Sequence, residues 1–338
     1  PRASGDSSHP SRNSPPAERH FFTPGFKRVR DAFERGVTKP ISWRKKQLNS
    51  VLKMLEENRS VIIETVQKDL RRHKLETNLV EVDYMINTIK DTVRDLDDWV
   101  KPEYPPKAIL YLLNGIIIYK EPYGVVLVIG TWNYPIQLLL TPMLGAIAAG
   151  NAVIVKPSEV ADASAKFIAK TLPKYVDNDA VIVIEGGPEE MTELLKQKFD
   201  YIFFTGSTNI GKIVHAAAAK HLTPVTLELG GKCPVYIDDA VDLTITAKRI
   251  LWCKLINCGQ TCIAPDYILC SKEVMTMPHY SSYDPWCIYF IIVYVLFCNM
   301  TMPIYSSYNF KINNYVYLGC NVLLPIQAIS QKIIFSLY

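Results

Sequence analysis

The segment NCGQTCIAPDY, from Asn257 to Tyr267, places a small oxidisable side chain, Cys262, in an irregular stretch of sequence. Gly259 and Pro265 flank this cysteine and argue against a regular helix or strand around it. A buried core cysteine usually lies inside a regular element. A nucleophilic thiol needs an exposed turn, polar neighbours and a base from elsewhere in the chain. The sequence of this segment thus leaves three readings of Cys262 open: a core thiol, a metal ligand or a nucleophile.

The spacing of the neighbouring cysteines argues against a metal site. Four and three residues separate Cys253, Cys258 and Cys262, which is not the Cys-x-x-Cys spacing of zinc ligands. The nearest upstream histidine is His221, so the local sequence shows no Cys-His dyad either. A thiolate at Cys262 would instead need support from a helix end, backbone amides and a carboxylate base.

Two polar side chains near apolar strands suit the chemistry of a thiol nucleophile. Glu228, in LELGGK, lies inside an apolar stretch, where burial would raise its pKa toward that of a general base. The alternative is a strand-end glutamate on the solvent face. Asn133, in GTWNYP, follows a strand and could donate to a developing oxyanion, although a turn-forming asparagine fits the same position.

The stretch FFTGSTNIGK has the features of an anion-binding turn between a strand and a helix. Gly206 and Ser207 form the turn, and the N-terminus of the following helix would favour a pyrophosphate. Gly211 and Lys212 complete most of a nucleoside-triphosphate loop, but that pattern needs Ser or Thr where Ile213 stands. A phosphate-loop NTPase is thus a distant alternative, and an ordinary strand-to-helix turn is another.

The stretch IVKPSE places Lys156 and Glu159 directly after a strand. A lysine and a glutamate three residues apart can both reach the hydroxyl groups of a ribose. The alternative is a surface helix start, with Pro157 in its first turn and Ser158 as its cap.

The elements that must position these residues change character along the chain. Residues 1–25 are polar and rich in Pro and Ser, which predicts a disordered arm. From residue 26 to about 101 the pattern is helical, with an apolar stripe at three- and four-residue spacing formed by Ile86, Ile89, Val93, Leu96 and Val100. Prolines after residue 101 end the helix, and two short strands around Asn114 and Gly115 predict a hairpin.

From Tyr123 onward, short β-branched runs alternate with Ala-rich helical stretches. The runs are YGVVLVIG, NAVIVKP, AVIVIEGG, DYIFFTG and PVTLELGG. This alternation predicts an α/β fold with a parallel sheet buried on both faces. Ligands bind such sheets beyond the carboxyl ends of the strands, so the turns after the strands are where a site is expected.

The last part of the chain, residues 275–338, does not continue this rhythm. It is rich in tyrosine, has only three charged side chains (Asp284, Lys311 and Lys332), and repeats MTMPHYSSYD as MTMPIYSSYN. The apolar run 286–298 is shorter than the roughly 20 residues of a spanning helix. A membrane-associating tail, a genuine repeat module and an aberrant terminus remain open, and we favour the aberrant terminus.

The composition limits the class of protein. The chain has 338 residues with 49% hydrophobic and 21% charged side chains, which is typical of a globular protein of two domains. A net charge of +4 is too weak to indicate a nucleic-acid partner. The polar N-terminal stretch has no apolar core of a secretory signal, so we expect an intracellular protein with reduced thiols, cytoplasmic or at the cytosolic face of a membrane.

The five motifs together, in this order and spacing, resemble the aldehyde dehydrogenase superfamily, and most closely its class 3 group, which includes the fatty aldehyde dehydrogenases. The similarity covers about residues 26–274. It implies a Rossmann-type dinucleotide-binding domain followed by an α/β catalytic domain. It also implies NAD or NADP as cofactor, a medium- or long-chain or other apolar aldehyde as substrate, and usually a homodimer.

The resemblance also implies a role for each candidate residue. Cys262 matches the nucleophile, Glu228 the general base, and Asn133 the oxyanion donor, which works with the backbone N–H of Cys262. No metal is implied. The cofactor-binding positions are Lys156 and Glu159 at the adenosine ribose, Gly206 and Ser207 in the phosphate turn, Gly211 on the following helix, and Trp132.

The chain departs from the family's pattern after about residue 274. The expected Glu-x-Phe-Gly-Pro stretch and the strands that complete the catalytic domain are missing. We therefore expect residues 26–228 to hold the helical segment, a bridging hairpin and the dinucleotide-binding domain, and residues 229–274 to begin an incomplete catalytic domain. The sheet edge of that domain is expected to stay open, and a dinucleotide-binding fragment without turnover is an alternative function.

Overall fold

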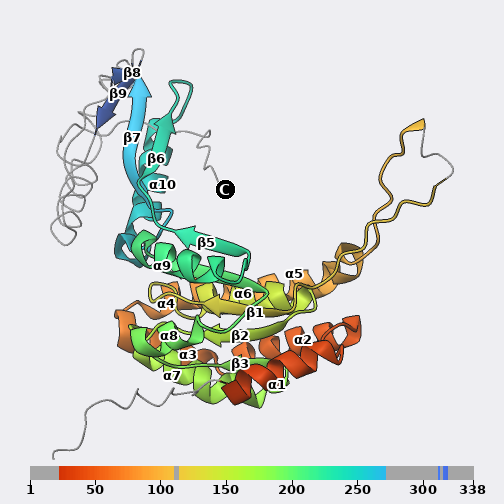
Figure 1. Cartoon of the computed structure of the whole chain (residues 1–338). Coiled ribbons are helices and arrows are strands. Elements are labelled where there is room, and N and C mark those ends of the chain that lie inside the picture. Colours follow the sequence, from red (N-terminus) through yellow and green to blue (C-terminus); the bar gives the residue numbers. More distant parts are fainter. Residues whose placement is uncertain (1–22, 110–113, 272–310, 313–314, 319–338) are drawn as a thin grey trace, which may run out of the picture.

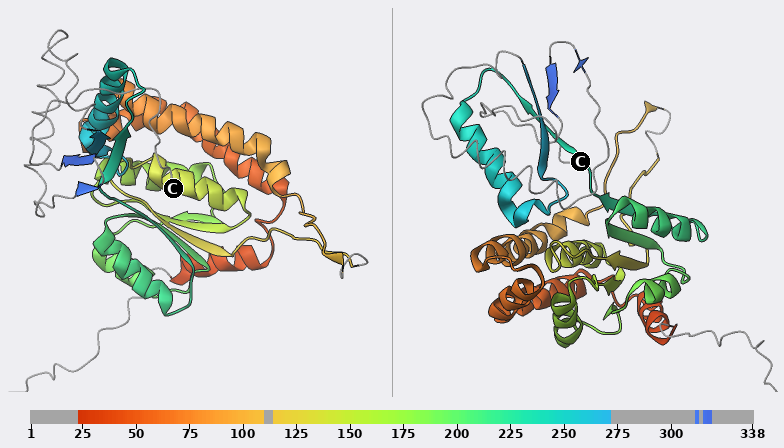
Figure 2. Two further views of the ribbon diagram at one scale, coloured as in Figure 1. Left: turned by 90° about the horizontal axis from the view of Figure 1, so that it is seen from above. Right: turned by 90° about the vertical axis from the view of Figure 1, so that its left-hand side faces the viewer.

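The computed structural model describes residues 23–109, 114–271, 311–312 and 315–318. Its centre is a five-stranded parallel sheet between two layers of helices, and a smaller sheet stands at the end opposite α1 (Figure 1, Figure 2). The expected α/β class is confirmed. The expected arm 1–25 lies largely outside the described residues, because the description begins within α1 at Thr23.

The first hundred residues are helical, as the periodicity predicts. The elements are α1 (Thr23–Glu34), α2 (Ile41–Glu57), α3 (Arg59–Leu70), α4 (Lys74–Thr77), the π-helical turn Asn78–Asp83 and α5 (Tyr84–Trp99). On α5 the predicted stripe faces the core: Ile86, Ile89 and Leu96 are buried, and Val93 packs against the same core. Helices α2, α3 and α5 of this segment cover one face of the sheet, and α1 packs on the other face.

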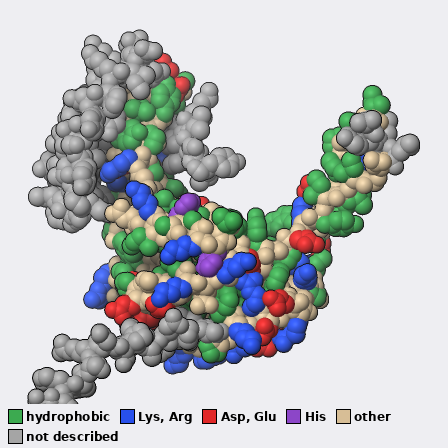
Figure 3. All heavy atoms as spheres, in the orientation of Figure 1, with side chains coloured by type: hydrophobic (Ala, Val, Ile, Leu, Met, Phe, Trp, Pro, Cys, Tyr) green, Lys and Arg blue, Asp and Glu red, His purple; other side chains and the backbone are tan. Residues whose placement is uncertain are grey.

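Residues 102–109 and 114–122 form the two sides of an extended arm that projects from the body of the protein (Figure 1). Its two sides meet at a single antiparallel bridge, in which Glu103 and Ile118 exchange backbone hydrogen bonds of 3.0 and 2.9 Å. The described part thus has the hairpin path but not the two regular strands that the sequence predicts. Large apolar side chains on the arm are exposed, including Tyr104, Ile109 and Tyr119 (Figure 3).

The central sheet follows the predicted runs closely. Its strands are β1 (Val125–Ile129), β2 (Ala152–Lys156), β3 (Val181–Val183), β4 (Tyr201–Gly206) and β5 (Val225–Leu229). The intervening helices are α6 (Gln137–Ala148), α7 (Asp162–Thr171), α8 (Pro188–Leu194) and α9 (Thr208–Ala219). The strands lie in the order β3-β2-β1-β4-β5. The chain thus places β2 and β3 on one side of β1 and then β4 and β5 on its other side, so a switch point lies between β1 and β4. Open α/β sheets bind ligands at such a switch point.

Two apolar cores hold the sheet. Side chains on one face, such as Val126 and Val153, pack with helices α2, α3, α5, α6 and α7. Those on the other face, such as Leu127 and Ile154, pack with α1, α8 and α9. All residues of β1 and β2 are buried, which explains why these strands read as unbroken apolar runs instead of alternating.

The second sheet lies next to the segment that carries Cys262. Its elements are β6 (Cys233–Ile237), α10 (Leu243–Leu255), the 3-10 turn Ile256–Gly259, β7 (Pro265–Ser271), β8 (Lys311–Ile312) and β9 (Tyr315–Leu318). β6 and β7 are parallel, whereas β9 pairs antiparallel with β7. The expectation of an open sheet edge is therefore wrong at β7, because a strand from the tail supplies the missing backbone partners.

The other features expected of the tail fall outside the described residues. They are the repeated decapeptide and the apolar run 286–298. Within the described part of the chain, no helix is long and apolar enough to cross a membrane.

Candidate active site

The candidate residues gather at the carboxyl edge of the central sheet. The register pairs Ile129 at the end of β1 with Lys156 on β2, and Thr205 on β4 with Glu228 on β5. The turns that follow β1 and β4 flank the switch point. Motifs far apart in the sequence are thus brought to one edge by the parallel topology.

The turn after β1 carries Trp132 and Asn133, both half-buried. Gly130 lets this turn approach α6, because a Cβ there would lie 2.9 Å from the Leu139 side chain. The Asn133 amide donates to the carbonyl of Gln260 at 2.8 Å, and its Oδ1 is buried without a hydrogen-bond partner. An asparagine amide has two N–H donors, so one remains for an oxyanion.

After β2, Lys156 and Glu159 are close together, as their spacing suggests. Lys156 is buried, and its ammonium group pairs with the carboxylate of Glu159, which is 45% exposed. Burial alone would raise the pKa of Glu159, but the hydrogen bonds from Lys156 and from its own backbone N–H outweigh it and lower the pKa. The pair therefore presents a charged acceptor to the solvent.

The turn after β4 leads directly into the N-terminus of α9. Ser207 caps the N-terminus of α9, and its hydroxyl accepts from the backbone N–H of Ile210 at 3.4 Å. Gly206 ends the strand, and Gly211 is buried within α9, where a Cβ would lie 3.0 Å from Leu229 on β5. The glycine at 211 allows the helix to pack closely on the strand that carries Glu228.

Glu228 does not lie in the apolar environment that the sequence suggests. Its side chain is exposed at the sheet edge, although the neighbouring residues Leu227 and Leu229 pack against a core. Strand alternation explains the difference, because successive side chains point to opposite faces. The expectation of a buried carboxyl group is therefore wrong for the described residues.

The nucleophile loop is irregular, as predicted. Cys262 is exposed, and Pro265 begins β7. Three consecutive residues, Asn257, Cys258 and Gly259, have φ values of 52, 54 and 75°. The thiol of Cys233 on β6 donates to the carbonyl of Cys262 at 3.2 Å. Burial, followed by the nearby Asp266 and Cys262, raises the pKa of Cys233, so that this thiol stays protonated as a donor.

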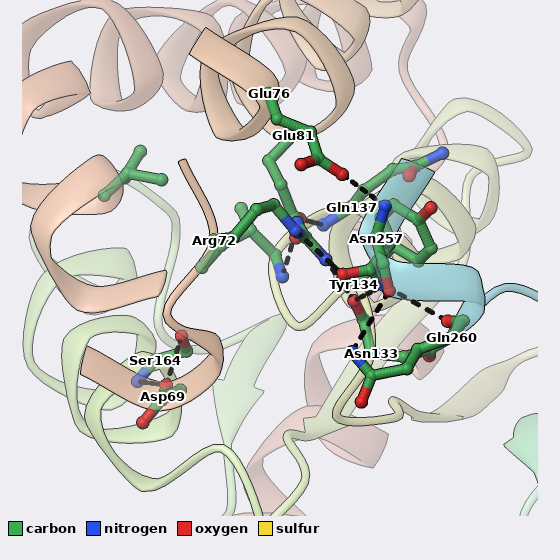
Figure 4. A network of polar contacts seen from close by, with 12 residues as sticks. Asp69, Arg72, Glu76, Glu81, Asn133, Tyr134, Gln137, Ser164, Asn257 and Gln260 are labelled. Carbon is green, nitrogen blue, oxygen red and sulfur yellow. Dashed lines mark hydrogen bonds and ion pairs between the residues drawn. The ribbon is translucent and has the colours of Figure 1, made fainter. Parts of the chain in front are cut away.

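A buried network that the sequence analysis missed joins this loop to the rest of the protein (Figure 4). Arg72, between α3 and α4, contacts Glu81, Asn133 and Asn257. The one signal in the sequence was Glu81, a charge within the run LVEV, because charged residues are rarely buried unless paired. Arg72 stands in a run of basic residues that looks like a solvated surface.

The described residues show no group of three or more His, Cys, Asp or Glu side chains that could hold a metal ion.

The chain is similar to characterised dehydrogenases. Residues 24–277 match the aldehyde dehydrogenase family. Over 248 residues the chain is 52% identical to aldehyde dehydrogenase family 3 member A2 of Pongo abelii. The matched stretch covers 73% of this chain and 51% of that relative. It is 50% identical over 247 residues to the dimeric NADP-preferring aldehyde dehydrogenase of Mus musculus, covering 73% and 54%.

The fold agrees with this similarity. The substrate-bound state of Staphylococcus aureus AldH matches with a TM-score of 0.71 at 41% identity, over 75% of this chain and 56% of that one. The chain spans about half the length of the curated relatives that it matches, 51% and 54% in the two above. On these grounds the chain belongs to the aldehyde dehydrogenase family.

Proposed function

We propose that this chain oxidises aldehydes to carboxylic acids with NAD or NADP, using Cys262 as the nucleophile. The observation that carries the proposal is the contact between two loops from different sheets. The amide of Asn133, at the switch point, donates to the carbonyl of Gln260, two residues before Cys262. This contact supports the proposal because it joins the loop of the candidate thiol to the loop of the candidate oxyanion donor.

The residues account for both halves of the reaction. The Cys262 thiolate attacks the carbonyl carbon, and the free N–H of Asn133 and the backbone N–H of Cys262 donate to the oxyanion that forms. Collapse of this thiohemiacetal expels a hydride and leaves a thioester on sulfur. Glu228, exposed at the same edge, takes a proton from the water that hydrolyses the thioester and frees the thiol.

The residues present fit a dinucleotide. The N-terminus of α9 and the turn at Gly206 and Ser207 offer backbone N–H groups to a pyrophosphate, and Lys156 with Glu159 offers a donor and an acceptor to ribose hydroxyls. When bound, the nicotinamide supplies the hydride acceptor. One solved relative supports this assignment: the Mycobacterium tuberculosis aldehyde dehydrogenase complexed with NAD+, which matches at 25% identity with a TM-score of 0.64.

The substrate class rests on the class 3 resemblance of the motifs, which favours a medium- or long-chain or other apolar aldehyde. A homodimer belongs to the same proposal, and the name of the dimeric relative from Mus musculus supports it. An association with the cytosolic face of a membrane through residues 275–338 belongs to the same proposal. A series of straight-chain aldehydes of increasing length tests the substrate class, since kcat/KM should rise with chain length if an apolar tail is bound.

The main test measures binding and turnover on the same preparations. The 338-residue chain should bind NADH or NADPH and form the reduced cofactor when an aldehyde is added. Cys262→Ala should abolish turnover but keep binding, whereas Cys253→Ala, a half-buried cysteine on α10, should keep most of both. Near-parental turnover in the Cys262→Ala protein would rule out the proposed mechanism.

The same experiment separates the alternatives. Binding without turnover in the parent would favour a dinucleotide-binding function without aldehyde oxidation. Magnesium-dependent ATP hydrolysis that is lost in Lys212→Ala would favour the NTPase instead. Against the NTPase, Ile213 of this chain occupies the position of the metal-binding hydroxyl, and its side chain is 59% exposed.

A further inference from the structure

Arg72 is a buried cation at the junction of three segments. Its side chain is 1% exposed, and that of its partner Glu81 is 0% exposed. The two form an ion pair of 2.7 Å between Nη1 and Oε1. A pair this deeply buried loses its hydration, and it persists only where further hydrogen bonds satisfy both ions. The remaining contacts of the two groups show what the pair holds together.

The second carboxylate oxygen of Glu81 anchors the helix that follows the Asn133 turn. It accepts from the backbone N–H groups of Ile136 at 3.1 Å and Gln137 at 2.7 Å, at the start of α6. Burial raises the pKa of Glu81, and Arg72 together with these two N–H groups opposes that rise. The carboxylate at the helix N-terminus is stabilised by the helix dipole as well. Glu81 therefore fixes the turn that carries the oxyanion donor.

The other nitrogens of Arg72 reach the nucleophile loop. Nε and Nη2 donate to Oδ1 of Asn257 at 3.0 and 2.7 Å, and Nη2 also donates to the Asn133 carbonyl. The guanidinium lies over the ring of Tyr134 at 4.6 Å, and the Tyr134 hydroxyl is 2.7 Å from that of Thr261, next to Cys262. One side chain thus contacts both loops of the reaction centre.

Asn257 begins a strained turn. Its φ of 52° and that of Cys258, 54°, lie in the left-handed region, which asparagine tolerates but which is strained for Cys258. The Asn257 amide donates to the carbonyls of Asn133 at 2.9 Å and Gln260 at 3.1 Å. Its backbone N–H donates to Glu76. The side chain held by Arg72 therefore ties the strained turn to the Asn133 loop.

We propose that Arg72 is a positioning residue for the reaction centre: through Asn257 it holds the Cys262 loop in fixed register with the Asn133 amide. The inference rests on the proposed function only in calling Cys262 the nucleophile. A displacement of about 1 Å between reacting groups can lower a rate by about 10²-fold. Loss of this contact should therefore affect the chemical step and leave the cofactor turns after β2 and β4 unchanged.

The matched pair for the test is Arg72→Met and Arg44→Met. Arg44 is also a buried arginine of the helical segment, and it donates three hydrogen bonds, to the carbonyls of Lys39 and Ala148. Its contacts hold α2 against the loop after α6. Arg72→Lys is the conservative variant. Asn257→Gly allows the left-handed backbone but removes the amide.

The first readout is hydrogen exchange followed by peptide mass spectrometry. Arg72→Met loses four hydrogen bonds, to Glu81, Asn133 and Asn257. Exchange in residues 256–264 and 133–137 should therefore accelerate by at least about tenfold, the effect expected for a single charged hydrogen bond. Exchange in β2 and β4 should not change. Arg44→Met should leave residues 256–264 unaffected. A purely structural role would accelerate exchange throughout the chain and would appear in both variants.

The second readout is the split between turnover and binding. Arg72→Met should lower kcat by about 10²-fold and change the Kd of NADH less than twofold, with partial recovery in Arg72→Lys. Asn257→Gly should have a similar effect, and the double variant should be no worse than either single one, because both act through one contact. If Arg72→Met does not fold, Arg72→Lys and Asn257→Gly carry the same exchange comparison.

The outcomes separate this inference from the proposed function. Unchanged exchange in residues 256–264 of folded Arg72 variants would overturn the positioning role, whatever the turnover. A parent without aldehyde oxidation but with the localised acceleration would keep the positioning role and refute the proposed function.

Discussion

Lys156→Met should separate cofactor binding from folding. Lys156 ends a buried central strand, and its ammonium group contacts Glu159, whose side chain is 45% exposed. Methionine keeps the length and apolar stem of the lysine. The remaining carboxylate can be solvated, so removal of the charge leaves no buried ion unpaired. We therefore expect the free energy of unfolding to change by no more than about 1 kcal/mol.

Dinucleotide binding should respond much more strongly. A hydrogen bond to a charged group contributes about 1.5–3 kcal/mol, which corresponds to about 10- to 150-fold in affinity. NADH titration monitored by fluorescence gives the Kd, and the urea midpoint gives the stability. Lys166→Met is the control, because it removes the same charge from an exposed i,i+4 pair on α7. If Lys156→Met bound NADH within twofold of the parent at unchanged stability, the ribose-binding role of this lysine would be refuted.

Three further outcomes are expected. Gly124→Ala should cost about 2–4 kcal/mol in urea unfolding, because Gly124 has a φ of 141° and its Cβ would lie 2.1 Å from Oδ2 of Asp200. Asp69→Ala should cost about 1–2 kcal/mol in the same assay, since this carboxylate of α3 accepts from two backbone N–H groups at the start of α7, at 3.0 and 2.8 Å. The control is Asp162→Ala, which removes the acidic partner of the exposed Lys166 pair on α7 and should leave the urea midpoint nearly unchanged. Burial raises the pKa of the Cys270 thiol, so this thiol ionises at a lower pH in the unfolded chain than in the folded one. The free energy of unfolding should therefore fall as the pH rises above about 8.5. Cys270→Val should reduce this fall.

The sequence predicted the central sheet well because its strands are buried on both faces. Runs such as VVLVI and AVIVK have no polar positions, and the structure buries all of their residues. The apolar stripe on α5 was equally easy to predict, since Ile86, Ile89 and Leu96 lie on one face of a single helix. These signals are local, and the parallel topology then places the polar turns at one edge.

The rest depended on contacts that periodicity does not report. The exposure of Glu228 is set by the face of β5 on which its side chain stands, and an apolar neighbourhood in sequence does not decide that face. The pairing of β9 with β7 joins segments more than forty residues apart. Arg72 and Asn257 are 185 residues apart, and neither belongs to a pattern that would associate them.

That separation has a consequence for the order in which the protein is made. At about 5–20 residues per second, a ribosome adds the 185 residues between Arg72 and Asn257 in roughly 10 to 40 s. During this interval the guanidinium has an earlier partner, because Glu81 follows it by only nine residues. We expect the ion pair to form in the nascent chain, with the nucleophile loop docking onto it last. The part of the active site that must be most precisely placed would then be the final one to become ordered during synthesis.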